Sequence, residues 1–409
     1  MHKINKFLSK HINLIFLIFI ILQPITDVFT GISINFDFLV SPGIIVRVIF
    51  MFLFLYYLIF ISKCLYRKKA LLLLLIIFIY MIIFSLTYPS YYEIASLFKA
   101  FYFPIMFIAL FIMYDDNNKV NNRYLLFTLF IYIFVIILAS ITNTAFQSYD
   151  IAKTGSVGWF NSANEIGAII AILLPILFEQ TYKKFDLIKL LFLILVVIVS
   201  FKLGTRIPLV SLGLCLVIYY IKVMSKLLKL KYKKTFTGVI ILSIAILSTF
   251  IIMLPKMPIY KNIIIHSKFL KIDSVDDIFR NGETMDHFIF SRRLSYLDDT
   301  NSVYVNSDLY NKLFGIGYVK NNKMIEMDIF DIFYRHGVIG FLIYFCSIIS
   351  MFCFKKIKKF DKFYILPLFL IIFISCFAGH VLVSPAVSIF VVIIILNMLF
   401  NEKKGGVIY

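Results

Sequence analysis

Acidic and arginine side chains gather around one long polar stretch of the chain. Glu326, Asp328 and Asp331 stand together at the start of an apolar run, and Arg292 and Arg293 precede them in the sequence FSRR. Partial burial raises the pKa of a carboxylate and suits it to act as a base. A guanidinium is a planar, permanently charged fork that matches phosphate oxygens. We therefore expect any chemistry where this polar stretch meets the apolar segments; a polar helix start and a solvated loop are the alternatives.

The run that begins at Glu326 has the period of a helix, with apolar and small residues on shared sides as far as Gly340. Asp331 and Arg335 are four residues apart, a spacing at which a carboxylate and a guanidinium pair across one helical turn. Gly337 and Gly340 would let a neighbouring helix approach closely. The pattern predicts a helix that carries its acids into the apolar region.

Composition makes the lipid bilayer the solvent for most of the chain. Of 409 residues, 61% are hydrophobic and 15% charged, and the mean hydropathy is +0.94. A soluble globular protein does not need so much apolar surface, and a membrane-spanning helix uses about 20 apolar residues. Apolar runs lie near 12–31, 44–62, 70–88, 95–114, 124–142, 164–182, 187–201, 207–223, 236–254, 328–354, 363–380 and 382–400. They predict an all-α polytopic membrane protein with about twelve transmembrane helices.

Basic residues fall in alternate connections between these runs. Lysine and arginine cluster at both ends of the chain and in every second connection, whereas the links 31–43, 88–94 and 143–163 are nearly free of them. By the positive-inside rule the basic connections are cytoplasmic. We therefore expect a multi-pass protein of the cytoplasmic membrane with both termini cytoplasmic and one large extracytoplasmic loop. That loop, residues 256–327, has ten basic and nine acidic residues, a balance suited to folding in water.

This topology predicts three parts of the chain. Residues 1–255 hold transmembrane helices one to nine, residues 256–327 form the extracytoplasmic loop domain, and residues 328–409 hold the last three helices and a cytoplasmic tail. Mixed three- and four-residue apolar spacing within the loop predicts short helices there.

Polar residues also cluster at the predicted outer end of the sixth span. Ser162 stands three residues before Glu165, the spacing of a capping box that starts a helix. A capped helix with no catalytic duty accounts well for Ser162 and Glu165. It accounts less well for Asn161 and Asn164, which we retain as candidate site residues.

A second outer helix start follows in the sequence KLGTRIPLV. Thr205 can cap a helix that has Pro208 in its first turn. Arg206 then stands at an outward-facing helix N-terminus, with Lys202 just before it. Backbone N–H groups, the helix dipole and a guanidinium together make an anion site that suits a lipid phosphate. The alternative is an interfacial residue that reaches to the headgroups or pairs with a neighbour.

Charge and cysteine placement exclude other classes. The net charge of +19 is spread over short connections, so we expect membrane lipid and no nucleic acid as a partner. The five cysteines lie in or beside apolar runs, which gives no disulfide framework and no thiolate metal site.

At these residues the chain resembles the superfamily of O-antigen polymerases and O-antigen ligases, which are bacterial membrane glycosyltransferases. It is most similar to the Gram-positive branch associated with capsular polysaccharide, exopolysaccharide or teichuronic acid. The resemblance rests on the twelve-span plan with one large outer loop before the last spans, and on the segments FNSANEIG, GTR, FSRR, LFGIGY and EMDIFDIFYRHGVIGF.

The resemblance implies a membrane glycosyltransferase C-type fold and inverting transfer from an undecaprenyl-diphosphate-linked oligosaccharide to a glycan acceptor hydroxyl. It implies no cofactor and no metal ion. Carried over by position, the diphosphate is bound by Arg206, Arg293 and Arg292. The catalytic acids at the acceptor hydroxyl are Glu326, which occupies the place where ligases show a histidine–asparagine pair, and Asp328. Secondary contacts are Asn161, Asn164, Glu165, Lys202, Arg335 and His380.

The function expected from these residues is polymerisation of lipid-linked oligosaccharide units, with a flippase and a chain-length regulator as partners. A ligase that transfers finished glycan to another acceptor is one alternative. A lipid-linked oligosaccharide flippase or transporter is another, because intramembrane charges often mark transport paths. Transporters commonly have two related halves with broken helices, and no such symmetry is evident in this sequence.

Overall fold

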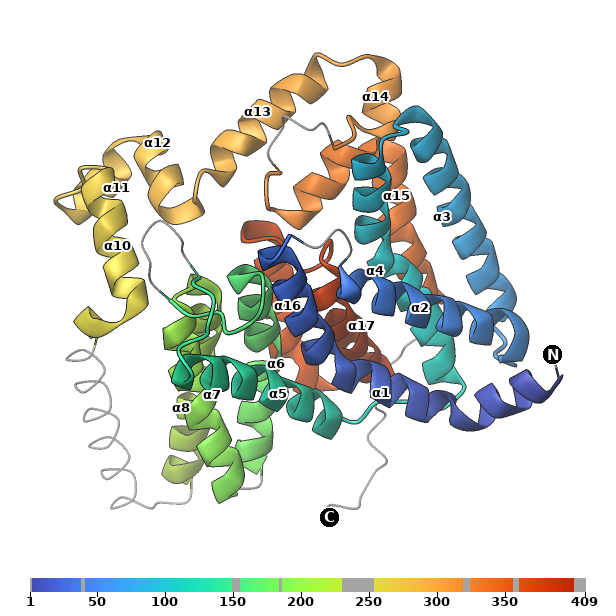
Figure 1. Cartoon of the computed structure of the whole chain (residues 1–409), viewed down its shortest axis with the longest axis horizontal. Helices are drawn as coiled ribbons and strands as arrows, with labels where there is room; N and C mark the ends of the chain where they lie inside the picture. Colours follow the sequence, from blue (N-terminus) through green and yellow to red (C-terminus); the bar gives the residue numbers. More distant parts are fainter. Residues whose placement is uncertain are drawn as a thin grey trace. The chain divides into compact units, whose positions relative to one another are not determined.

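The computed structural model describes residues 2–37, 41–148, 155–183, 186–229, 254–318, 324–355 and 360–400. These residues form helices joined by turns and contain no β-strand, only an isolated bridge between Phe146 and Gly158. Figure 1 shows the order of the helices along the chain. The chain is an all-α polytopic membrane protein.

Helices occupy the predicted spans wherever the structure describes them. They are α1 (His2–Asn35), α2 with the π-helix η1 (Pro42–Tyr56 and Tyr57–Ile61), α3 (Arg67–Thr87), α4 (Tyr91–Asp115), α5 (Asn122–Ile141), α6 (Ala163–Lys183), α7 (Leu187–Leu203), α8 (Arg206–Lys229), α15 (Asp328–Lys355), α16 with the 3₁₀ turn η4 (Ile365–Phe377 and Lys362–Tyr364) and α17 (Pro385–Phe400). The predicted span 236–254 lies outside the described residues except for its last position, Leu254.

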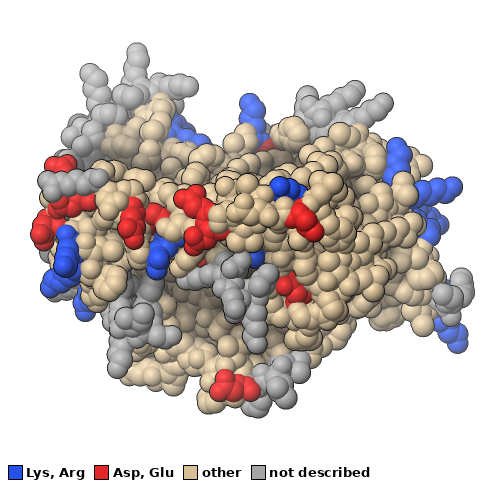
Figure 2. All heavy atoms as spheres, turned by 90° about the horizontal axis from the view of Figure 1, so that it is seen from above, with Lys and Arg blue, Asp and Glu red and all other residues tan. Residues whose placement is uncertain are grey.

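Eight helices among the described residues are long and apolar enough to cross a membrane by length and composition, namely α1 to α6, α8 and α15. Their outer faces agree with that role. On α3, for example, Leu72, Leu75 and Ile79 are 58%, 55% and 49% exposed, a stripe at helical spacing that only lipid would cover favourably. Figure 2 shows one face of the protein, where charged side chains form small separate patches among other residues.

The predicted short helices of the loop are present. They are η2 (Leu254–Lys256), α10 (Pro258–Phe269), α11 (Val275–Arg280), α12 (Gly282–Met285), the π-helix η3 (Asp286–Phe290), α13 (Arg293–Val305) and α14 (Leu309–Phe314). The chain divides into two compact units: unit 1 comprises 1–128 and 279–409, and unit 2 comprises 129–278.

The centre of unit 1 is formed by α4 and α17. α4 packs against α2, α3, α15 and α17, and α17 is buried along its whole length. A helix that is apolar on all sides is stable only when other helices surround it. The two helices are also joined by a hydrogen bond of 3.0 Å, which the hydroxyl of Tyr114 donates to the side-chain oxygen of Asn397.

A buried ion pair joins α1 and α2. The guanidinium of Arg47 contacts the carboxylate of Asp27, and its Nε donates to the side-chain oxygen of Gln23 at 3.0 Å. A lone charge inside the bilayer costs about 2.5–3.5 kcal/mol on insertion scales. Pairing offsets that cost, and it accounts for both charges without a catalytic role.

α15 is interrupted near its start, which corrects the prediction of a regular helix from Glu326 to Gly340. Glu326 has φ 61° and lies in the turn before the helix, which begins at Asp328. Gly337 has φ 64° and ψ −172°, so the helical hydrogen bonds break there. Only glycine adopts such a backbone conformation without strain.

The interruption provides hydrogen-bond acceptors for the segment LFGIGY. The backbone N–H groups of Ile316 and Gly317 donate to the carbonyls of Tyr334 and Arg335, at 3.0 and 3.2 Å. A Cβ placed on Gly337 would lie 2.4 Å from the backbone nitrogen of Gly315. The close neighbours of Gly337 are therefore the end of α14 and the residues that follow it, and a Cβ on Gly340 would meet the hydroxyl of Tyr80 on α3. Neighbouring helices approach α15 closely at both glycines, as predicted.

In unit 2, α6 and α8 run parallel. Near their starts, a Cβ on Gly167 would lie 2.9 Å from the Thr205 hydroxyl oxygen. Further along, the Ser211 hydroxyl donates to the carbonyl of Ala171 at 2.7 Å. α7 precedes α8 and ends at Leu203, and the following Gly204, with φ 75°, closes the turn between the two helices.

Replacing Gly337 with alanine tests whether the interruption of α15 is required. The added Cβ would meet backbone atoms of Gly315 and Leu313 at about 2.4–2.5 Å and would impose a strained φ. We expect Gly337→Ala to abolish or sharply reduce the yield of folded protein, measured by size-exclusion chromatography and thermal unfolding in detergent.

Gly213→Ala is the matched control, because a Cβ on this α8 glycine meets nothing within 4 Å. Alanine favours a helix over glycine by about 1 kcal/mol, so this variant should unfold at the wild-type temperature or above. Equal unfolding temperatures for the two variants would contradict the geometry described for α15.

Candidate active site

Three segments of unit 1 meet at the carboxylate of Glu326. Nη2 of Arg293, the first residue of α13, lies 3.0 Å from Oε2 of Glu326. Nε2 of His380, from the turn between α16 and α17, lies 3.9 Å from the same oxygen. The side chains of Arg293, Glu326 and His380 are 12%, 32% and 28% exposed. The acid–guanidinium–imidazole cluster is thus half-buried and partly open to solvent.

Asp328 fixes the turn that carries His380. Its Oδ1 accepts the N–H of His380, and its Oδ2 accepts those of Val381 and Leu382, each at 2.8 Å. Asp328 is only 1% exposed. These hydrogen bonds are all with backbone N–H groups, so Asp328 positions the residues of the neighbouring turn.

Asp331 fixes the turn that carries Glu326. Its two oxygens accept the N–H groups of Ile325 and Met327 at 3.1 and 3.2 Å. The residues on both sides of Glu326 are therefore tethered to the first turn of α15. A Cβ on Gly379 would lie 2.4 Å from the carbonyl oxygen of Glu326, which shows how closely the two turns approach.

The two adjacent arginines of FSRR lie in different environments. Arg293 is turned inward to Glu326 and also donates to the carbonyl of Phe290 at 3.4 Å. Arg292 is exposed, has φ 67°, and its guanidinium lies 5.8 Å from the centre of the Tyr296 ring. Only Arg293 of this pair belongs to the cluster around Glu326.

Asp286 holds the start of α13, a role that no pattern in the sequence indicates. Its carboxylate accepts the N–H of Leu294 at 2.9 Å and both the N–H and the hydroxyl of Ser295, at 2.8 and 2.5 Å. Asp286 is the first residue of the π-helix η3, and its partners lie eight and nine residues later in the chain. A cap search at the usual spacing of two or three residues would not find it.

Arg335 lies deeper, under the segment LFGIGY. It is fully buried, and its Nη1 donates to the carbonyl of Gly317 at 3.1 Å. Glu93, at the start of α4, accepts the N–H of Tyr318 at 2.5 Å. Glu93 was not among the predicted site residues. Its signal in the sequence is Ser90, three residues earlier, whose hydroxyl accepts the N–H of Glu93 at 3.2 Å and caps the helix.

The charge state of Glu326 corrects a prediction. Burial alone would raise the pKa of Glu326, but the neighbouring His380 and the guanidinium of Arg293 outweigh it and lower the pKa to about 2. The sequence analysis expected partial burial to raise this pKa towards that of a working base. The basic neighbours that reverse the shift come from residues 33 positions earlier and 54 later in the chain.

In unit 2 the predicted residues stand at the starts of α6 and α8. The Ser162 hydroxyl accepts the N–H of Glu165 at 3.3 Å, which confirms the predicted cap. Asn161 is exposed, and Asn164 and Glu165 are half-buried. Because α6 and α8 touch at their first turns, the structure brings this group beside the start of α8.

The start of α8 differs from the prediction in one respect. Arg206 is its first residue and is exposed, as is Lys202 at the end of α7. Thr205 precedes the helix, but its hydroxyl oxygen is buried and has no hydrogen-bond partner. The predicted side-chain cap by Thr205 is therefore wrong, while the placement of Arg206 at a helix N-terminus is confirmed.

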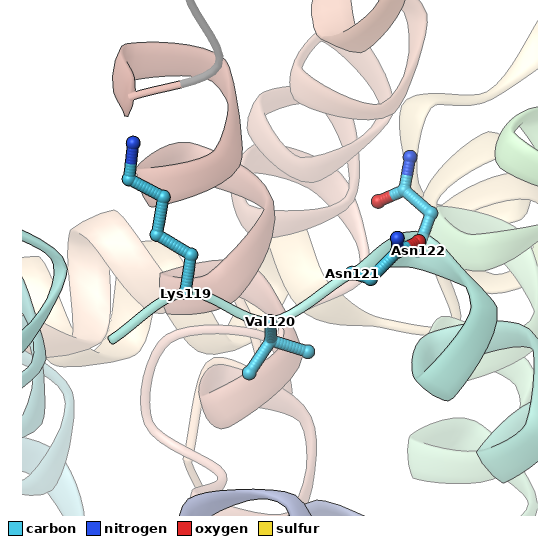
Figure 3. Close-up of a pocket in the computed structure, with 4 residues that line it drawn as sticks. All are labelled: Lys119, Val120, Asn121 and Asn122. Atoms are coloured by element: carbon cyan, nitrogen blue, oxygen red, sulfur yellow. The ribbon is translucent and has the colours of Figure 1, made fainter. Parts of the chain in front are cut away.

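A cavity of about 320 Å³ lies away from these residues. It is lined by Lys119, Val120, Asn121 and Asn122 in the turn between α4 and α5 (Figure 3). α4 is 25 residues long, or about 37 Å, and this turn is at the opposite end of it from Glu93. Lys119 donates to the carbonyl of Phe400 at 3.0 Å, so we assign the turn a structural role.

The cluster around Glu326 combines groups that bind anions with groups that move protons. A guanidinium binds phosphate oxygens in two-pronged fashion, and an imidazole accepts or donates a proton near neutral pH. Within the ranges that the structure describes, no three histidine, cysteine or acidic side chains are grouped so as to hold a metal ion.

A comparison with known protein families matches nearly the whole chain. The model of a family described as O-antigen ligase like membrane protein matches residues 9–277 and 271–404. No curated protein and no solved structure matches significantly.

Replacing Asp328 with asparagine tests its anchoring role. An asparagine amide puts a donor where the carboxylate now accepts backbone N–H groups, which would leave at least one buried donor unsatisfied. Such a loss costs about 1–3 kcal/mol. We expect Asp328→Asn to lower the unfolding temperature and to speed amide hydrogen exchange at residues 380–382. Asp299→Asn, at an exposed site on α13, is the control and should change neither.

The depressed pKa of Glu326 predicts how its contribution to stability depends on pH. Because the folded-state pKa is about 2 and the ordinary value is about 4.3, the ionised group stabilises the fold above about pH 4.3. That contribution is lost as the pH falls towards 2. Wild type should therefore unfold at higher temperature than Glu326→Gln at pH 7, and the difference should shrink below pH 4. A constant difference across this range would contradict the ion pairing of Glu326.

Proposed function

Because the chain belongs to the family of O-antigen ligase-like membrane proteins, we propose that it is a polysaccharide polymerase. It would transfer an oligosaccharide from a lipid diphosphate, of the undecaprenyl type, to a hydroxyl group of a glycan acceptor. Family membership indicates glycan transfer by a membrane protein. The observation that supports this reaction in unit 1 is the Arg293–Glu326–His380 cluster, because it places a phosphate-binding group beside groups that can orient and deprotonate a hydroxyl.

The proposed site faces the outside of the cytoplasmic membrane. Its support is the positive-inside pattern, which puts the segment 256–327 and the turn between α16 and α17 on the extracytoplasmic side. A lipid tail stays in the bilayer, so the bond between the carrier diphosphate and its sugar must react at the membrane surface. We propose that the start of α15, where polar residues give way to an apolar helix, lies at such a boundary.

In unit 1 we assign the diphosphate to Arg293, with Arg292 as an outer contact. Arg293 already holds one anion, the carboxylate of Glu326, at 3.0 Å. A diphosphate that engages the same guanidinium would compete with Glu326 for its donors. Glu326 would then lose part of the positive charge that keeps its pKa low and would turn to His380 and the acceptor.

In unit 2 we assign phosphate binding to Arg206. Support comes from its exposed position as the first residue of α8, where helix N–H groups and the dipole favour anions. We propose that the phosphate-binding surface of unit 2 also includes Asn161, Asn164, Glu165 and Lys202. Asp328 and Arg335 are proposed as positioning residues, because both are buried and contact backbone groups.

A ligase activity is the second candidate, because the matching family is described by that activity. The two activities differ in the acceptor. A polymerase extends a glycan that is itself lipid-linked, whereas a ligase transfers the glycan to a different molecule. Purified protein supplied with only one lipid-diphosphate oligosaccharide distinguishes them, since only a polymerase would then form longer chains. A flippase or chain-length regulator remains a proposed partner.

Removing the proposed anion contacts should stop the reaction. We expect purified wild type to convert an undecaprenyl-diphosphate oligosaccharide to longer glycans, seen by gel electrophoresis. Loss of one electrostatic contact in a transition state costs about 100-fold or more in rate. Arg206→Ala and Glu326→Ala should each lose at least that much without loss of folded protein.

Arg123→Ala is the matched control, because Arg123 is also an exposed arginine at a helix start but belongs to a connection predicted to be cytoplasmic. It should retain wild-type activity. Full activity in both the Arg206 and Glu326 variants would show that the assigned residues are wrong.

A further inference from the structure

We infer that His380 is the group that accepts the proton of the attacking hydroxyl, and that Glu326 orients the His380 imidazole for that step. This inference rests on the proposed glycosyl transfer. It changes the role of Glu326 from the base itself to the partner of the base.

The backbone around both residues is held in an uncommon conformation. Glu326 and His380 have the same positive φ of 61°, a region that is strained for residues other than glycine. Each is kept there by a buried carboxylate: Asp331 binds the N–H groups on either side of Glu326, and Asp328 binds that of His380 itself. Strain held in place by surrounding structure often marks a functional site.

The close approach of the two turns brings the side chains together. Gly379 allows the backbone of the α16–α17 turn to contact the carbonyl of Glu326, where a Cβ would fit at only 2.4 Å. As a result Nε2 of His380 lies 3.9 Å from Oε2 of Glu326. That distance is longer than a hydrogen bond, and such contacts commonly tighten when substrate binds. The exposed 28% of the His380 side chain leaves room for substrate access.

A carboxylate beside an imidazole does two things for proton transfer. It favours the tautomer in which the nearer nitrogen, Nε2, carries the hydrogen, and it stabilises the imidazolium after the proton has arrived. Nδ1 is then the nitrogen that takes the proton of the hydroxyl. The charged groups that face His380 are Glu326 from the turn before α15 and Asp328 from the start of α15, with Arg293 from α13 beyond Glu326.

Glu326 is poorly suited to be the base. Its carboxylate is already paired with Arg293, and its pKa of about 2 makes it a weak proton acceptor near neutral pH. An imidazole has an ordinary pKa of about 6.5, close to the pH at which the reaction would run. General-base catalysis is most efficient when the pKa of the base lies near that pH.

The step balances within the substrates and this residue. The hydroxyl oxygen of the acceptor forms a bond to the anomeric carbon of the donor sugar. The bond from that carbon to the diphosphate oxygen breaks, and its electron pair stays on the diphosphate, which Arg293 binds. The hydroxyl proton moves to Nδ1 of His380, and the imidazolium later releases it to water.

The test compares His380→Asn with wild type in the glycan-extension assay. Asparagine tolerates a positive φ better than most residues, and it keeps the backbone N–H that Asp328 accepts. We expect turnover to fall by about 100-fold or more, with little change in the donor concentration needed for half-maximal rate. The acidic limb of the pH–rate profile, which reports protonation of the base, should disappear. His266→Asn on α10 is the control and should keep both rate and profile.

A second measurement does not depend on activity. The imidazole of His380 can be titrated by NMR of detergent-solubilised protein and identified by the signal that His380→Asn removes. Glu326→Gln should lower its pKa, because removing the adjacent negative charge destabilises the imidazolium. A titration that does not move in Glu326→Gln would overturn the pairing even if a variant were inactive for structural reasons.

The outcomes separate this inference from the proposed function. If wild type fails to extend the lipid-diphosphate glycan, the proposed function itself fails. If wild type is active and His380→Asn keeps its turnover and acidic limb, His380 is not the base. A His380→Asn variant that is altered only in donor affinity would make His380 a binding residue and would also overturn the inference.

Discussion

Two buried carboxylates at the start of α15 are the constraint on which the unit 1 site depends. Asp328 and Asp331 do not face solvent; they accept backbone N–H groups from the α16–α17 turn and from the turn before α15. A buried carboxylate is costly unless several donors satisfy it. These donors belong to the turns that carry Glu326 and His380. The hydrogen bonds that satisfy the buried carboxylates therefore also fix the positions of Glu326 and His380.

In the resulting cluster, two basic side chains share one carboxylate. One carboxylate, Glu326, serves both a guanidinium and an imidazole, so a change at either partner alters the other. An anionic ligand on Arg293 would weaken one of the two contacts and strengthen the other. In the proposed reaction, donor binding and proton transfer would be linked through this single oxygen atom of Glu326.

The positions of the helices could be predicted from the sequence, whereas the contacts of the candidate residues could not. Apolar runs of about 20 residues specify spanning helices almost by themselves, and Ser162 and Arg206 occupy the helix starts predicted for them. The break at Gly337, the inward turn of Arg293 and the low pKa of Glu326 could not be predicted in the same way. Each depends on residues far apart in the chain, such as Gly315 for Gly337 and His380 for Glu326, and periodicity within one segment carries no information about them.

The interruption at Gly337 also divides α15 into a first part with charged residues and a second, apolar part. The part after it, residues 338–355, would be about 27 Å long as a helix, close to the hydrophobic thickness of a bilayer. Residues 338–355 are by themselves long enough to span the bilayer. Residues 328–336, which precede the interruption, therefore do not need an apolar composition. They include two acids, an arginine and a histidine, and inserting such residues into a bilayer is energetically costly.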